Sequence, residues 1–356
     1  MAEYFCAVEL SKFQKKVLTI WLATGAVMVF LMVAIGGITR LTHSGLSMTD
    51  WNLIVGSIPP VSDQEWNESF KAYQNFPEFK ELNYNFSLED YKSIFWWEYL
   101  HRLLGRVLGI VFLIPFLAFM AKRWFLGNKK LRNQLLVVFA LGAFQAFLGW
   151  FMVKSGLVDV PRVSHYRLSA HLLTAFITCL YILWIIFEIN VPRTKNMGQL
   201  FSFGKQIRLL LLLTLIQAVY GAFVAGLQAG LVHNTWPLMD GEIVSSAVFA
   251  MDPVYLNFVM GKSGVQFVHR MLAIIIFVWV AVIYVKGVRR LTDPLQLQAL
   301  RLMLIFVLVQ FGLGIITLLL RVPIELGVLH QMGALLLLSS LVFAYHRFTP
   351  PSIEKK

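Results

Sequence analysis

The sequence is short of charged residues. Asp, Glu, Lys and Arg make up 14% of its 356 residues, and 58% are hydrophobic, whereas a soluble domain is roughly one quarter charged. This composition excludes an ordinary soluble fold and predicts an all-α integral membrane protein. Apolar runs of about 20 residues, enough to cross a bilayer, occur at 17–38, 94–119, 134–153, 164–187, 207–227, 264–285, 302–320 and 324–345. We therefore expect eight transmembrane helices.

Cysteine is scarce too. The chain has two, Cys6 on the predicted cytoplasmic side and Cys179 in the middle of a span, which excludes a disulfide framework in the outer loops. The N-terminus lacks an Arg-rich, acid-poor stretch and carries Glu3 and Glu9. We expect neither a transit peptide nor a cleavable signal, and a bacterial inner membrane is the simplest location.

Acidic residues are fewer than basic ones, and the net charge is +12. Cytoplasmic loops of membrane proteins carry an excess of Lys and Arg. Here the excess falls in one alternate set of segments, namely 12–16, 122–132, 193–208, 286–301 and 347–356. Both termini are therefore expected in the cytoplasm, and the positive charge indicates topology and not nucleic-acid binding.

The two halves of the chain resemble each other. The stretch "GGITRLTHSGLSMTDW" (36–51) aligns without gaps on "GAFVAGLQAGLVHNTW" (221–236), and "EYLHRLL" (98–104) matches "QFVHRML" (266–272). Two later pairs continue the repeat: "FQAFLG" (144–149) with "VQFGLG" (309–314), and "HLLTAF" (171–176) with "HQMGAL" (330–335).

Because both halves start on the same side of the membrane, the repeat is parallel. It predicts two tandem four-helix bundles, residues 1–188 and 207–356, joined by a cytoplasmic linker at 189–206. The main asymmetry is the outer loop 40–93, which is long, acidic and rich in aromatic residues. This loop is interpreted either as a solvated cap or as a docking platform for a partner protein, and 228–263 is its shorter equivalent.

Four histidines, His101, His171, His269 and His330, lie inside the even-numbered spans, a few residues from their outer ends. They form a layer roughly 10 Å below the outer surface. Ionisable groups at such depth are costly and by default functional. Two opposed imidazoles suit haem, whose iron takes axial ligands on both faces. Each half is thus predicted to hold one haem, between His101 and His171 and between His269 and His330.

Other metal centres fit this sequence less well. Zinc or copper sites of four ligands would need Cys or carboxylate neighbours, and none accompanies the histidine pairs. A di-iron carboxylate site needs at least two helices with a Glu-x-x-His motif. Only one such motif occurs, formed by Glu98 and His101.

Glu98 distinguishes the two halves, because the matching residue is Gln266. The two side chains are nearly isosteric, yet only Glu98 can carry a proton or a negative charge. Residues three apart share a helix face, so Glu98 lies one turn from His101. We therefore expect the first half to hold the reacting group and the second a haem that passes electrons. The alternative is that Glu98 forms a salt bridge with Arg102 or Arg106.

Further polar residues in the spans are arginines, which have two interpretations, and glutamines. Arg102, Arg106 and Arg270 could pair with haem propionates or extend to the membrane surface. Three glutamines precede small residues by one turn, which indicates close helix packing with interhelical hydrogen bonds. These pairs are Gln145 with Gly149, Gln217 with Gly221, and Gln310 with Gly314.

Several of these stretches resemble the haem A synthases, which oxidise a methyl group of haem O to the formyl group of haem A for terminal oxidases. The similar stretches are "GGITRLTHSGLSMTDW", "WWEYLHRLLGR", "FLGWFMVKSGLVDVPRVSHYRLSAHL", "GLVHNTWPLMDG" and "VQFVHRMLA". The resemblance implies that His101 and His171 bind the substrate haem O, that His269 and His330 bind a haem b cofactor, and that Glu98 is required for turnover. It implies two successive hydroxylations giving a gem-diol, which loses water.

The same resemblance implies a haem O synthase (protohaem farnesyltransferase) as a partner. The cysteine pair that some members carry in an outer loop has no counterpart here. Two rival functions stay open: a quinol-linked dihaem b-type electron-transfer protein, and a haem transporter. The sequence identifies no electron acceptor, and it leaves the oligomeric state, including a homo-oligomer, undecided.

Overall fold

The computed structural model describes residues 10–48, 58–156, 163–192 and 197–350. Over these ranges the regular structure is helical, and eight helices are long and apolar enough to cross a membrane. They are α1 (Lys12–Leu41), α4 (Leu88–Ala121), α5 (Lys129–Gly156), α6 (His165–Asn190), α7 (Met197–Gly226), α8 (Lys262–Arg290), α9 (Pro294–Leu319) and α10 (Ile324–Arg347). The prediction of an all-α membrane protein with eight spans is confirmed.

Capping residues explain where several helices begin. Ser11 and Gln14 form a capping box before α1, and Ser87 and Asp90 form another before α4. Such boxes satisfy main-chain N–H groups that have no partner inside the helix. The helix α6 ends at Asn190 and α7 begins at Met197, so both helix ends lie within the linker predicted at 189–206. Hydropathy marks only the part of a helix that lies in lipid, so it misses the polar first turns of α7.

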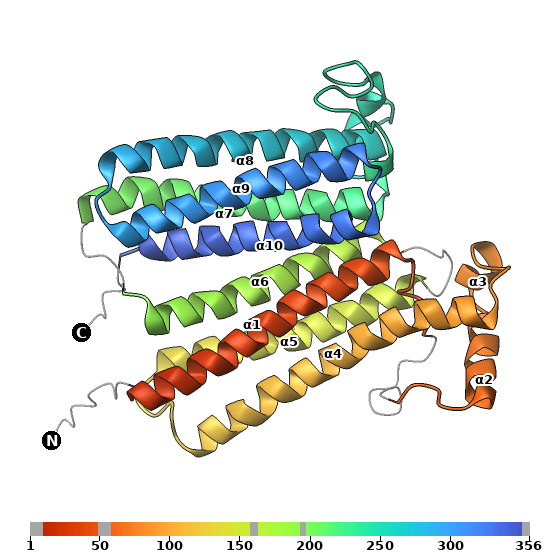
Figure 1. Ribbon diagram of the computed structural model, residues 1–356, viewed down its shortest axis with the longest axis horizontal. Coiled ribbons are helices and arrows are strands. Elements are labelled where there is room, and N and C mark those ends of the chain that lie inside the picture. The colour runs from red at the N-terminus through yellow and green to blue at the C-terminus, as the bar shows by residue number, and fades with distance from the viewer. Residues whose placement is uncertain (1–9, 49–57, 157–162, 193–196, 351–356) are drawn as a thin grey trace.

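The spanning helices form two groups that lie side by side, α1 with α4, α5 and α6, and α7 with α8, α9 and α10 (Figure 1). Within the groups, α1 packs against α4 and α7 against α8, as the repeat requires. The groups meet where α10 contacts α1 and α6, and where α6 contacts α7. The corresponding pairs α4–α5 and α8–α9 differ, because α8 packs closely against α9 whereas α4 makes no comparable contact with α5. The residue bounds of the two predicted bundles stay a prediction.

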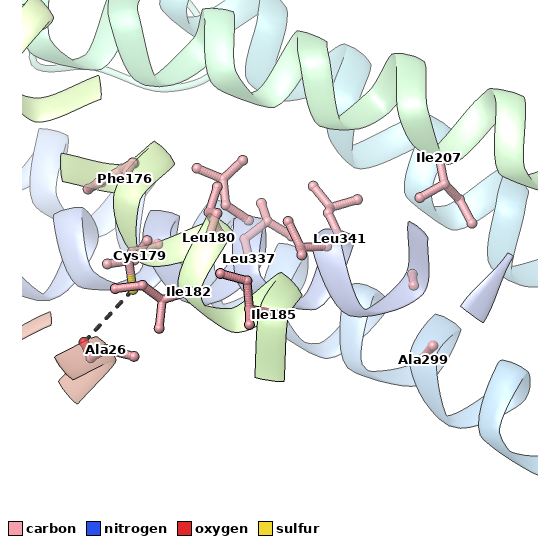
Figure 2. Close-up of a cluster of buried hydrophobic side chains, with 14 of the residues drawn as sticks. Ala26, Phe176, Cys179, Leu180, Ile182, Ile185, Ile207, Ala299, Leu337 and Leu341 are labelled. Carbon is pink, nitrogen blue, oxygen red and sulfur yellow. Dashed lines mark hydrogen bonds between the residues drawn. The ribbon is translucent and has the colours of Figure 1, made fainter. Parts of the chain in front are cut away.

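The buried core runs along α6, between the two groups. Figure 2 shows Phe176, Cys179 and Ile185 of α6 in a cluster that includes Leu337 and Leu341 of α10. The Cys179 thiol is buried and donates to the Ala26 carbonyl oxygen of α1 at 3.9 Å. Helices in lipid associate mainly through such close packing and not through the hydrophobic effect. The joint between the halves is therefore well packed.

The first outer loop folds as a cap on α4. Its helices α2 (Asp63–Tyr73) and α3 (Pro77–Glu81) lie beyond the outer end of α4 (Figure 1). Trp66 contacts Phe95 edge to face at 5.0 Å, and Tyr73 stacks on Tyr91 at 5.1 Å. This packing agrees with the cap interpretation. Trp51, which the repeat pairs with Trp236, lies outside the described residues.

The second outer loop contains three 3-10 helices, η2 (Ala229–Leu231), η3 (Ser246–Phe249) and η4 (Val254–Phe258). His233 anchors it at the start of α8. Its Nδ1 lies 2.6 Å from Asp240 Oδ2, and its Nε2 lies 2.9 Å from Ser263 Oγ. This loop therefore covers the outer end of the second group, as α2 and α3 cover the first.

Candidate functional site

The four predicted histidines lie on four different helices, His101 on α4, His171 on α6, His269 on α8 and His330 on α10. The ring centroids of His269 and His330 are 6.4 Å apart, with planes at 79°. A metal–imidazole bond of about 2 Å places two rings on opposite sides of one metal at a centroid separation of roughly 6 Å. His101 and His171 are close enough to interact electrostatically. The second pair thus has the spacing expected of two axial ligands.

Each of these histidines packs on a glycine of the neighbouring helix. A Cβ built at Gly36 of α1 would lie 3.1 Å from His101 Nε2. A Cβ on the other three glycines would lie 2.9–3.3 Å from Cε1 of the facing ring; these pairs are Gly149 with His171, Gly221 with His269 and Gly314 with His330. A Cβ at Gly314 would require a shift of His330, and at the other three positions it would make a tighter contact with the imidazole than side chains usually make. From the sequence, Gly149, Gly221 and Gly314 were interpreted only as helix-packing residues, and their contact with histidine was missed.

The donor set in each half consists of two imidazoles. Among the described residues there is no group of three or more His, Cys, Asp or Glu that could hold a metal ion. A metal bound here needs its other ligands from a prosthetic group, and a porphyrin supplies four nitrogens in one plane. The Nδ1 atoms of His171, His269 and His330 are buried without a hydrogen-bond partner of good geometry. Buried polar atoms without partners are rare in native structures, and a bound ligand is one explanation for them. The residues present therefore fit haem.

Glu98 is buried beside the first pair. Its Oε1 lies 2.5 Å from Arg102 Nη2, and its Oε2 accepts from Ser47 Oγ at 2.7 Å and from the main-chain N–H of Met48 at 2.8 Å. Arg102 also donates to the Met48 carbonyl oxygen at 3.1 Å. The salt bridge that we considered as an alternative is thus present. Arg102, Ser47 and the Met48 N–H all donate to the Glu98 carboxylate, and a carboxylate that accepts every contact suits the ionised form.

Gln266 occupies the matching place, and its neighbours have the opposite polarity. Its Nε2 donates to the carbonyl oxygens of Ala229 at 2.9 Å and Val232 at 2.5 Å, while Arg270 donates to its Oε1 at 3.2 Å. The loop after α1 therefore offers hydrogen-bond donors to a carboxylate, and the loop after α7 offers acceptors to an amide. In both halves the residue fastens an outer loop to a spanning helix.

The arginines next to two of the histidines hold these loops as well. Arg270 donates to the carbonyl oxygens of His233 at 2.5 Å and Thr235 at 3.0 Å, and lies 5.9 Å from the ring centroid of Trp236. Arg102 is engaged with Glu98 and Met48. Neither the propionate interpretation nor the surface interpretation anticipated these loop contacts. Arg106, one turn further along α4, is half-buried.

Comparison with known proteins agrees with this architecture. A family model described as "Cytochrome oxidase assembly protein" matches residues 19–342. A protein of Flavobacterium johnsoniae named "Heme A synthase" is 45% identical over 342 residues, covering 95% of this chain and 99% of its own. Proteins of the same name from Nitrosospira multiformis and Wolbachia pipientis are 43% and 42% identical, each covering 93% of this chain and 93% and 92% of their own. The chain therefore belongs to the haem A synthase family of cytochrome oxidase assembly proteins.

Proposed function

We propose that this protein is a membrane enzyme acting on haem, a haem A synthase that oxidises a methyl group of haem O to a formyl group. One observation carries the proposal. Two matching pairs of imidazoles, each ring seated on a glycine, are accompanied by a carboxylate, Glu98, in the first half and by its amide isostere, Gln266, in the second. The relatives named "Heme A synthase" support the same assignment.

Two of the four histidines bind the substrate haem, and the other two bind the cofactor haem. His101 and His171 hold the porphyrin of haem O, and His269 and His330 hold haem b. With His269 and His330 as the residues that would hold it, haem b would supply one-electron transfer. The spacing of 6.4 Å between the His269 and His330 rings supports this ligation.

The reaction converts the methyl group to an alcohol and then to a gem-diol, which loses water to give the aldehyde. Each hydroxylation by water removes two electrons and releases two protons from the reacting carbon and the attacking water. The electrons leave to an acceptor that the chain does not identify. The ionised Glu98, held by Arg102 and Ser47, stabilises the positive charge that develops at the methyl carbon or accepts a proton.

The decisive experiment is expression with a haem O synthase, followed by extraction and separation of the haems. We expect haem A from the wild type and haem O from Glu98→Gln, with turnover lowered by about 10²–10⁴-fold. His43→Ala, which changes a histidine outside the four-ligand layer, is the control and should still yield haem A. Haem b alone from wild type and Glu98→Gln would favour the dihaem electron-transfer protein. Release of unmodified haem by the wild type would favour the transporter.

The source of the oxygen is a second prediction. A porphyrin iron with histidine on both faces has no open position for dioxygen, so we expect the oxygen atom to come from water. The alcohol intermediate should be isolated from preparations made in ¹⁸O-labelled water, because the aldehyde exchanges its oxygen with solvent. Label found in the alcohol from dioxygen, and none from water, would contradict this mechanism.

The membrane location and the partner enzyme follow from the haem A synthase assignment. We propose a bacterial inner-membrane location with both termini in the cytoplasm and a haem O synthase as the supplier of substrate. The weak contact between α4 and α5 supports entry of the farnesylated substrate from the lipid between these helices.

A further inference from the structure

A cavity of about 360 Å³ lies between the first turns of α7 and the end of α10. This is the end of the bundle from which both termini extend (Figure 1). A Cβ at Gly204 of α7 would lie 2.6 Å from the main-chain oxygen of Phe348, just after α10. The buried rings of Phe203 and Phe348 also pack together, with their centroids 5.5 Å apart. The two segments that form the cavity are therefore held together by a close contact.

The cavity carries positive charge only. Lys205 and Arg208 line it and are exposed, and because they are three residues apart they share one face of α7. Among the described residues neither forms a salt bridge. The other residues that line the cavity are uncharged, namely Gly204, Tyr345, Phe348, Thr349 and Pro350. The cavity therefore offers two cations to a ligand and largely apolar walls.

Exposed leucines continue the same face of α7 towards the middle of the membrane. Leu209 lies one turn after Lys205 and is 40% exposed. Leu212 lies one turn after Arg208 and is 51% exposed. The apolar run of this span begins at 207, so the two cations lie where the helix enters the hydrocarbon. A molecule bound at this face would meet charge at the membrane surface and apolar side chains below it, which is the pattern that a phospholipid requires.

The first half shows that helix packing does not require these two cations. In the repeat, Ile20 of α1 matches Lys205 and Ala23 matches Arg208. The helices correspond as well, because α1 packs against α6 as α7 packs against α10. The first pair of helices thus forms without either charge. Lys205 and Arg208 are additions of the second half, and a ligand of opposite charge would explain them.

The two helix pairs also differ in how they are joined at this level. In the first half, Asn190 Nδ2 of α6 donates to Thr19 Oγ1 of α1 at 2.9 Å. The matching residues of the second half are Thr349 and Gly204. Gly204 has no side chain to join the helices, and the Thr349 hydroxyl donates to the Tyr345 carbonyl oxygen of its own segment at 2.6 Å. The hydrogen bond that joins the first pair therefore has no counterpart in the second, where the cavity lies.

We propose that this cavity is a binding site for one anionic phospholipid. Lys205 and Arg208 bind its phosphate through charge-assisted hydrogen bonds, and its acyl chains lie along Leu209 and Leu212. Basic pockets between transmembrane helices on the cytoplasmic side bind such headgroups, and the Lys and Arg bias predicts that this end of the bundle faces the cytoplasm. The inference uses none of the residues proposed to bind haem, so it stands or falls separately from the proposed function.

Native mass spectrometry of the full-length protein in neutral detergent tests the site. Phosphatidylglycerol and phosphatidylcholine with the same acyl chains are titrated separately, and the bound lipids are counted. We expect the wild type to bind one phosphatidylglycerol at least about tenfold more tightly than phosphatidylcholine, and the double variant Lys205→Gln/Arg208→Gln to lose this preference. Equal binding of the two lipids by the wild type would overturn the inference.

The helix α8 supplies a matched control. Lys286 and Arg289 have the same residue types and the same spacing near the end of α8, are exposed, and lie outside the cavity. The double variant Lys286→Gln/Arg289→Gln removes the same charge and should bind phosphatidylglycerol as the wild type does. Equal losses of binding in the two double variants would show that only the overall surface charge matters, and would overturn the site.

A cavity-filling variant separates the cavity from its charges. Thr349→Phe keeps Lys205 and Arg208 but places a ring in the space between α7 and the end of α10. Phosphatidylglycerol should then bind more weakly than to the wild type, and unchanged binding would contradict a role for the cavity. The Lys205→Gln/Arg208→Gln variant changes only exposed side chains, so its midpoint temperature of unfolding without lipid should equal that of the wild type. Its loss of binding is then not a loss of fold.

Two further measurements test other occupants of the cavity. Inorganic phosphate in large excess should not displace phosphatidylglycerol, because it lacks the acyl chains, and displacement would assign the cavity to free phosphate. Removal of residues 351–356 should leave the binding of phosphatidylglycerol unchanged. Markedly tighter binding after this truncation would assign the cavity to the last residues of the chain itself.

Discussion

Glu98 and Arg102 form a buried ion pair, with side chains 4% and 8% exposed. The matching Gln266 and Arg270 hold their loop with one charge fewer. A lone charge left in such a place is costly, because neither water nor a counter-ion compensates it. The second half shows that an amide at this position is compatible with the same backbone plan and with the buried arginine, so the carboxylate of the first half is consistent with a chemical use.

Removal of the guanidinium tests how strongly this pair holds the loop. Arg102→Leu leaves Glu98 unpaired, and we expect the free energy of unfolding to fall by about 3–5 kcal/mol. The matched control is Glu89→Gln, which breaks the exposed pair of Glu89 with Lys92 on the same helix and should cost less than about 1 kcal/mol. Unfolding in detergent measures both, and equal losses would contradict the assigned burial of the ion pair.

The cap contains a second buried acid, Glu78 of α3. Burial raises the pKa of Glu78 to about 8 from the usual 4.5; the hydrogen bond from the Tyr73 hydroxyl, at 3.1 Å, opposes the rise, and the negative charge of Glu98 adds to it. The folded state therefore binds this proton more tightly than the unfolded state. The resulting stability is fully present below pH 4.5 and is lost as the pH rises through about 8.

Thermal unfolding at pH 5.5 and 8.5 checks this prediction. The midpoint temperature of unfolding of the wild type should be lower at pH 8.5 than at pH 5.5. The decrease should be smaller in Glu78→Gln. Glu81→Gln, which alters an exposed acid of the same helix, should behave as the wild type. If all three proteins show the same pH dependence, Glu78 does not titrate in this range.

Much of the site was predictable at the residue scale, and its partners were not. The four histidines and the Glu98/Gln266 difference follow from the repeat and from the cost of ionisable groups in lipid. Ser47 and Met48 could not be identified as partners of Glu98, because these contacts join residues about fifty positions apart and no local pattern encodes them. The glycine contacts were missed for a similar reason, since they join different helices.

Among the helices, α9 offers an internal comparison of two glycines. A Cβ at Gly314 would lie 2.9 Å from His330 Cε1, whereas a Cβ at Gly312 would meet nothing within 4 Å. Gly314→Ala should therefore displace His330 and lose the second-half haem. Gly312→Ala should retain the haem and stabilise the helix slightly, by up to about 1 kcal/mol. Haem content after purification distinguishes them, and equal retention would exclude the assigned contact.

The existence of the spanning helices was predictable, because a bilayer demands about 20 apolar residues for each crossing. The residues at which these helices begin were less predictable. The helix α7 starts at Met197, ten residues before the apolar run at 207, and α4 begins at Leu88, six residues before its run at 94. Polar turns outside the lipid follow capping and loop packing, which hydropathy does not report. The aromatic contacts of α2 and α3 with α4 likewise depend on tertiary structure.

For the molecule as a whole, α1 begins and α10 ends at one end of the bundle, and the cap and the η2–η4 loop lie at the other (Figure 1). With the Lys and Arg bias, this arrangement predicts that both termini face the cytoplasm. A fluorescent protein fused to the C-terminus should therefore fluoresce in a bacterial host, and alkaline phosphatase fused there should be inactive. A fusion of phosphatase within 240–245 should be active, and the reverse pattern would exclude this topology.

Every contact between one of the four proposed ligand histidines and its glycine joins two different helices. A displacement of one helix along its partner by one turn, about 5.4 Å, would bring another residue of the same helix face against the imidazole where the glycine had been. A porphyrin could then no longer be received between the rings. Haem binding would therefore depend on correct helix alignment in the newly made protein. During biogenesis, haem absorbance would be expected only from molecules whose helices have reached their final positions.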